Sequence, residues 1–140
     1  MTEGKTEYLQ MIQDSISRMS TNSAIFKGFA ATIVAGVAAL SYDEMNCWVL
    51  GLSFLPVLAF AVLDIYYLRL ERRFRYLFDC VRRDEHEIDF AMEPAKTKCE
   101  LCKAKARIVD CLKSPSIYLF YPLMTAILGT VFVLKLKGVL

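Results

Sequence analysis

Three long runs of apolar residues constrain this chain more than any other feature of its sequence. The runs are residues 24–42, 47–63 and 116–134, and Lys27 is the only charged residue within them. Their lengths of 19, 17 and 19 residues are close to the roughly 20 that a helix needs to cross a bilayer. Because 56% of all residues are hydrophobic, the remaining polar chain is too short to cover these runs in water. We therefore predict an all-α integral membrane protein with three transmembrane helices.

The basic residues predict how the chain is oriented. Twelve of the 17 Lys and Arg residues lie in segment 65–115, whereas the turn 43–46 between the first two runs has none. Because positively charged segments are retained in the cytoplasm, the amino terminus and segment 65–115 are expected inside and the turn outside. The tail 135–140 is then expected outside as well, although Lys135 and Lys137 run against the rule.

The chain accordingly divides into seven predicted parts. They are a cytoplasmic amphipathic helix (1–23), the first transmembrane helix (24–42), an outer turn (43–46), the second transmembrane helix (47–64), a cytoplasmic helical region (65–115), the third transmembrane helix (116–134) and an outer tail (135–140).

The first of these parts has an apolar stripe. Leu9, Ile12, Ile16 and Met19 recur at helical spacing, which fits packing against either the bilayer surface or another protein helix. The N-cap residues at 20–23 predict a break in the helix before the first span.

The first span carries small residues at intervals of four. Gly28, Thr32 and Gly36 fall on one helical face. Small residues at this spacing let helix backbones approach closely in lipid. This face is therefore expected either to pack tightly against a neighbouring helix, in the same chain or in another copy of it, or to line a pore.

The second span is predicted to continue into the cytoplasm as one helix over residues 47–84, with a kink at Pro56. Apolar residues then recur at alternating steps of four and three, a spacing typical of a seam between packed helices. The seam residues are Leu63, Tyr67, Leu70, Phe74, Leu77 and Val81. The seam needs a partner, which is the amino-terminal helix, the helical segment 99–113 or another subunit.

Lys27 is costly inside a span unless it finds a partner or water. Counted from the outer ends of the first two spans at 1.5 Å per residue, Lys27 lies at a depth of about 22 Å and Asp64 at about 25 Å. Adjacent antiparallel helices bring the two residues to similar depth, so we predict an ion pair between them or between neighbouring subunits, at a position that also suits a gate. The alternative is that Lys27 snorkels to lipid phosphates and Asp64 ends the apolar zone.

A group of arginines begins just beyond the second predicted span, on the cytoplasmic side of the membrane. Its members are Arg69, Arg72, Arg73, Arg75, Arg82 and Arg83, of which Arg75 and Arg83 are spaced for helical ion pairs with Glu71 and Asp79. Such residues commonly bind lipid phosphates. They also suit an anionic cytoplasmic ligand such as a nucleotide or oligonucleotide, whose bases would stack on Tyr66, Tyr67, Phe74 and Tyr76.

The sequence favours no enzyme and no cofactor. Cys99 and Cys102 have the spacing of zinc and redox sites, but a zinc site needs two further ligands from Cys80, Cys111 and His86. We therefore expect no metal site, and free thiols in the reducing cytoplasm. No catalytic motif accompanies the single histidine.

Two stretches of the chain resemble a group of small bacterial membrane proteins. The first stretch is EYLQMIQDSISRMSTNSAIFKGFAATIVAGVAAL and the second is SFLPVLAFAVLDIYYLRLERRFRYLFDCVR. In that group a YL..IQ..I.RM..NS...KG opening precedes the first span, and LD.YYL..ER.FR.L...VR follows the second. Some members are similar to the membrane subunits of anti-phage systems, the Hailong channel subunit among them. The group's KG and LD correspond to Lys27-Gly28 and Leu63-Asp64.

The resemblance implies an oligomeric ion-channel effector in the bacterial inner membrane. Its ligand would be DNA or a nucleotide made by a nucleotidyltransferase, and opening would depolarise the infected cell. One copy has too few spans to enclose a pore, so a cyclic homo-oligomer is required, and we expect a tetramer. The alternative from the residues is a non-conducting anchor or scaffold that recruits a soluble partner through the seam.

Overall fold

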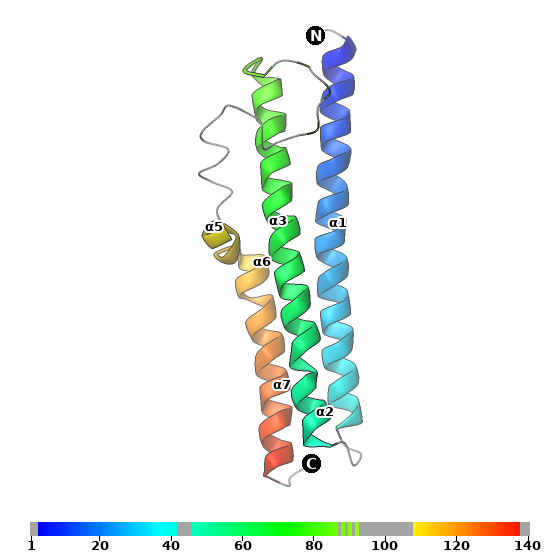
Figure 1. Ribbon diagram of the computed structural model, residues 1–140, viewed down its shortest axis with the longest axis vertical. Helices are drawn as coiled ribbons and strands as arrows, with labels where there is room; N and C mark the ends of the chain where they lie inside the picture. The colour runs from blue at the N-terminus through cyan, green and yellow to red at the C-terminus, as the bar shows by residue number, and fades with distance from the viewer. Residues whose placement is uncertain are drawn as a thin grey trace. The chain divides into compact units, whose positions relative to one another are not determined.

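A computed structural model describes residues 3–41, 46–86, 88, 90, 92 and 108–137. These residues form helices and turns and contain no strand, as predicted for an all-α chain. The helices, labelled in Figure 1, are α1 (Glu3–Leu40), α2 (Cys47–Leu52), α3 (Phe54–Arg82), α5 (Ile108–Leu112), α6 (Pro115–Tyr118) and α7 (Phe120–Leu136).

Three stretches of the described chain are long and apolar enough to cross a membrane. They are Gly4–Leu40, Cys47–Arg82 and Pro115–Leu136. By its internal contacts the chain divides into two compact units. The first unit comprises Met1–Ser23 and Ile65–Leu112, and the second comprises Ala24–Asp64 and Lys113–Leu140.

The predicted break at residues 20–23 is wrong, because α1 is continuous through them. The reason lies in what the hydroxyl groups do. Thr21 donates its hydroxyl to the carbonyl of Ser17 one turn earlier, at 3.0 Å. A hydroxyl that is satisfied in this way no longer competes with the backbone, and the segment contains no proline or glycine to stop the helix.

The expected single helix over 47–84 is interrupted once, at Ser53 between α2 and α3. Pro56 explains the position, because its ring collides with the carbonyl four residues earlier and its nitrogen donates no hydrogen bond. The helical hydrogen bonding is therefore disturbed at Leu52. At the adjacent Ser53, the hydroxyl donates a hydrogen bond to the Leu50 carbonyl at 2.6 Å. The sequence pointed to the proline but not to the earlier residue at which the helix breaks.

The same effect divides the third apolar stretch. Leu119 separates α6 from α7, three residues before Pro122. The carbonyl of Tyr118 is the one that Pro122 leaves without its usual helical donor. The stretch begins at Pro115, with Ser114 as its N-cap residue, and α7 ends at Leu136. These bounds are wider by one or two residues than the predicted span of 116–134.

The first unit has an apolar core between the amino-terminal part of α1 and the carboxy-terminal part of α3. Its buried members are Tyr8, Leu9, Ile12 and Ile16 from α1 and Phe74, Leu77 and Val81 from α3, with Met19, Leu70, Phe78 and Met92 packed around them. The apolar stripe of the first helix therefore covers most of the seam of the second. The ring of Phe90 adds an edge-on contact to Tyr8, with the ring centroids 5.4 Å apart.

The end of α3 is fixed by its own backbone and by a lysine from α1. Asp84 has a φ of 60°, and its N–H donates to the Val81 carbonyl while the N–H of Glu85 donates to the Cys80 carbonyl. This is the Schellman arrangement, in which a left-handed residue closes a helix. The Lys5 ammonium then contacts both the Arg82 carbonyl, at 3.2 Å, and the Asp84 carboxylate, at 2.5 Å. A cation at this position also complements the helix dipole.

The second unit joins the apolar part of α1 to α2, the first part of α3, and α7. The two ends of α7 each contact another helix. Near its start, the Tyr121 hydroxyl donates to the Phe60 carbonyl of α3, and near its end Lys135 donates to the Ser41 carbonyl that follows α1, at 3.1 Å. Within this unit α7 lies beside α2 (Figure 1). Lys135, which ran against the charge rule, thus binds a carbonyl at the carboxy-terminal end of α1.

Candidate functional site

The ion pair predicted from depth is present. The Lys27 ammonium lies 2.5 Å from Oδ2 of Asp64, joining α1 to α3 within the second unit. The Asp64 side chain is 0% exposed and that of Lys27 is 18% exposed. The two charges therefore neutralise each other inside the apolar helices, where an isolated charge would be very unfavourable. The snorkelling alternative does not describe Lys27 in this structure, and a gating role for the pair stays a prediction.

Aromatic rings of α1 and α3 stack on one another close to the pair in sequence. The ring of Phe60 stacks with those of Phe26 and Phe29, with centroid separations of 6.1 and 6.0 Å. Phe60 lies one helical turn before Asp64, and the two phenylalanines of α1 flank Lys27 in sequence. The full burial of the Asp64 side chain strengthens the attraction between the two charges.

Tyr121 of α7 is a third polar member of this site, and the sequence analysis did not single it out. Its side chain is buried. Its hydroxyl donates to the Phe60 carbonyl at 3.2 Å and also interacts with the Asp64 side chain. Three apolar helices thus contribute one polar group each: Lys27, Asp64 and Tyr121. The signal that would have found Tyr121 is its depth, about 20 Å from residue 134 at the outer end of the third predicted span.

The small-residue face of α1 is open in the single chain. Gly28, Thr32 and Gly36 are all exposed. A Cβ atom added to either glycine would meet nothing within 4 Å. The Thr32 hydroxyl donates to the Gly28 carbonyl at 2.9 Å, so it is satisfied within its own helix. Close packing of this face against another helix of the same chain, one of the three expected arrangements, is not found among the described residues.

The seam is used within the chain. Phe74, Leu77 and Val81 are buried and Leu70 packs on the same core. Tyr67 is half-buried, and Leu63 is 41% exposed. Of the three possible partners predicted for the seam, the amino-terminal helix of the same chain is the one that covers its cytoplasmic part.

The arginines divide into two groups by their surroundings. Arg75, Arg82 and Arg83 are exposed, whereas Arg69, Arg72 and Arg73 are half-buried. Arg75 forms the predicted pair with Glu71, at 2.7 Å, and Arg82 lies 3.5 Å from Asp79. The prediction that Asp79 pairs with Arg83 is wrong by one residue, because the three-residue helical step is also within reach of an arginine.

Two of the half-buried arginines lie near a buried thiol. Burial of Cys111 on α5 raises the pKa of its thiol, and the positive charges of Arg72 and Arg69 oppose that rise. The short helix α5 therefore lies close to the arginine-bearing face of α3, inside the first unit. Any anion that binds these two arginines would alter the surroundings of Cys111.

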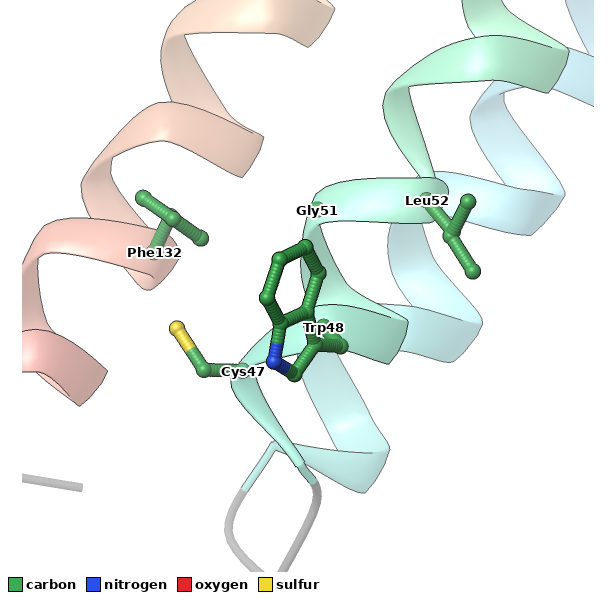
Figure 2. Close-up of a pocket in the computed structure, with 5 residues that line it drawn as sticks. All are labelled: Cys47, Trp48, Gly51, Leu52 and Phe132. Carbon is green, nitrogen blue, oxygen red and sulfur yellow. The ribbon is translucent and has the colours of Figure 1, made fainter.

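An apolar groove lies between α2 and α7 in the second unit. Figure 2 shows its lining, in which Phe132 of α7 faces Cys47 and Trp48 of α2, and Gly51 and Leu52 complete the set. The volume of the groove is about 410 Å³. Trp48 is 82% exposed, more than any other large apolar side chain in the described residues. A tryptophan at the end of a span is typical of the interface between bilayer and water.

The cysteine motif predicted to lack a metal, Cys99 and Cys102, lies outside the described residues. Cys47, Cys80 and Cys111 form no disulfide. Within the described ranges no group of three histidine, cysteine or acidic side chains is placed to hold a metal ion.

Comparison with known proteins identifies no relative of this chain. No protein-family model, no curated protein and no solved structure matches the chain.

Proposed function

We propose that the protein is an oligomeric ion-channel effector of bacterial anti-phage defence, in the inner membrane with its amino terminus in the cytoplasm. The observation that carries the proposal is the Lys27–Asp64 pair, buried between helices long and apolar enough to cross a membrane. Ionisable residues inside membrane helices are expensive and commonly mark ion pathways, proton relays or sensors. A purely passive anchor has no need for such a pair.

Oligomerisation follows from the number of spans. Three helices from one copy cannot surround a pore, so several copies must contribute helices around an axis, and a tetramer is the expected state. The exposed face of Gly28, Thr32 and Gly36 supports this reading. Helices of neighbouring subunits can approach closely there, either at the pore or at the subunit contact.

The ligand is expected to be anionic and to bind on the cytoplasmic side. Arg69, Arg72 and Arg73 supply guanidinium groups that form strong, paired hydrogen bonds to phosphates. In a cyclic oligomer these residues repeat as a ring. A nucleotide or short DNA made by a partner nucleotidyltransferase, as the sequence resemblance implies, fits this chemistry. The ligand changes conduction only by binding the open and closed states with different affinities.

The scaffold alternative is less well supported. A scaffold would recruit its soluble partner through the seam, but Phe74, Leu77 and Val81 are already buried against the amino-terminal helix. A partner that used this surface would first have to displace that helix. The scaffold reading also leaves the buried ion pair without a role.

An ion-flux assay separates the two readings. The purified full-length chain is placed in liposomes that hold a potassium gradient, and a voltage-sensitive dye reports the membrane potential. A channel collapses the potential in one of two conditions, with or without a short single-stranded DNA oligomer added on the cytoplasmic face. The variant Arg72→Gln/Arg73→Gln should lose the response to DNA, whereas Arg82→Gln, further from the predicted membrane boundary, should retain most of it. A potential that persists in both conditions supports the scaffold and contradicts the channel.

A further inference from the structure

The polar cluster contains one group that nothing so far explains, the hydroxyl of Tyr121. Its donation to the Phe60 carbonyl and its interaction with Asp64 connect α7 to the turn of α3 that carries the ion pair. In an α-helix the carbonyl of residue 60 is also the acceptor for the backbone N–H of residue 64. The phenol therefore binds the backbone that positions Asp64 and interacts with the Asp64 side chain.

A phenol can donate only one hydrogen, and both of its neighbours here are acceptors. The proton goes to the Phe60 carbonyl or to the Asp64 carboxylate, but not fully to both. A small movement of the hydroxyl is enough to change which acceptor it serves. Because Asp64 is fully buried, the loss or gain of one donor strongly affects how its negative charge is held.

Tyr121 also lies beside the interruption that separates α6 from α7. It occupies the first turn of α7, directly after the interruption at Leu119 and directly before Pro122. The interruption removes a backbone hydrogen bond at the junction with α6. Movement of the start of α7 relative to α6 therefore carries the Tyr121 hydroxyl with it.

We propose that Tyr121 is a positioning residue that holds the Asp64 carboxylate toward Lys27, and that a shift at the start of α7 releases it. The consequence for conduction rests on the proposed channel function, but the positioning role does not.

The test compares Tyr121→Phe with Tyr118→Phe, a matched control whose side chain is 60% exposed. Both substitutions remove one hydroxyl and keep the ring. The full-length protein, labelled with ¹⁵N-lysine and ¹³C-aspartate, is placed in liposomes, and solid-state NMR measures the dipolar coupling between Nζ of Lys27 and Cγ of Asp64. An Asp64→Asn sample identifies the Asp64 signal. The pair Lys5–Asp84 gives a second coupling and serves as an internal control.

The proposal predicts that Tyr121→Phe weakens the Lys27–Asp64 coupling to less than half, while the Lys5–Asp84 coupling is unchanged. Tyr118→Phe should keep both couplings at the wild-type value. An undiminished Lys27–Asp64 coupling in Tyr121→Phe overturns the positioning role. Loss of both couplings together means general unfolding and overturns the specific role as well. Since this readout needs no ion flux, it stands or falls separately from the channel function.

Discussion

Replacing Lys27 by methionine would leave the buried carboxylate of Asp64 without an opposing ammonium group. At the observed separation of 2.5 Å, two unit charges attract each other by about 7 kcal/mol if the effective dielectric constant is about 20. The cost of removing both groups from water offsets most of this energy. Removing one partner of such a pair nevertheless costs about 3–5 kcal/mol, because the other charge stays buried. Lys27→Met and Asp64→Leu should each destabilise the protein by that amount.

The double variant Lys27→Met/Asp64→Leu should be close to the wild type in stability or above it. Replacement of a whole buried pair by apolar side chains is often neutral or stabilising by about 1–4 kcal/mol. Since each single variant loses about 3–5 kcal/mol and the double variant loses none, the double-mutant cycle should give a coupling energy of at least about 6 kcal/mol. Unfolding by sodium dodecyl sulfate in mixed micelles, followed by circular dichroism, measures all four proteins. The exposed pair Asp79–Arg82 provides a control, with an expected coupling below about 0.5 kcal/mol.

Additive effects of the two substitutions would refute this reasoning, since they would show that the charges do not interact. The exchanged pair, Lys27→Asp with Asp64→Lys, gives a second check. It should recover assembly and activity that either single exchange loses, because the attraction does not depend on which helix carries which sign. If the exchanged protein behaves like the single variants, the pair is not what those variants disrupt.

Three further predictions concern the first unit. Leu77→Ala should lower the free energy of unfolding by about 2–5 kcal/mol, because the side chain is buried in the core. Leu63→Ala should lower it by less than about 1 kcal/mol. Equal losses for the two variants in denaturant titrations would contradict the packing of the seam. Burial raises the pKa of the Cys111 thiol more than the charge of Arg72 lowers it, so alkylation of Cys111 by iodoacetamide should begin at a higher pH than alkylation of an ordinary cysteine. Arg72→Gln should shift the pH profile of this alkylation to still higher pH. Peptide mass spectrometry measures the profile, and alkylation that begins at a lower pH than in a model thiol would refute the prediction. Lys5→Met should accelerate amide hydrogen exchange about tenfold in the last turn of α3, where the ammonium binds the terminal carbonyl. Exchange in α7 should stay unchanged. Uniform acceleration would indicate global destabilisation instead.

Much of this fold could be predicted because its main determinants are local. The three apolar stretches follow from composition over about 20 residues, which needs no knowledge of the partners. The Lys27–Asp64 pair could be predicted because the rise of a helix is constant, so that counting residues gives depth. Tyr121 was missed because the same count was applied only to charged side chains, although a buried hydroxyl also needs a partner.

The errors have physical causes that single-residue patterns do not reveal. The hydroxyl groups near residue 20 have two choices, to cap a new helix or to bond the preceding turn, and neighbouring contacts decide between them. Pro56 and Pro122 each disturb the helical hydrogen bonds about one turn before their own positions. The helix therefore breaks at Ser53 for Pro56 and at Leu119 for Pro122, rather than at the proline itself. The partner of the seam depended on tertiary contacts, and three candidates had the required apolar faces.

The proposed channel works in lipid as several copies of the chain around one axis. Native mass spectrometry of the protein released directly from lipid nanodiscs measures the number of copies without detergent exchange. We expect an assembly of four chains of 15.9 kDa each, which falls apart when Gly28 and Gly36 are both replaced by leucine. A single chain of 15.9 kDa that stays dispersed in buffer without any lipid or detergent would contradict it.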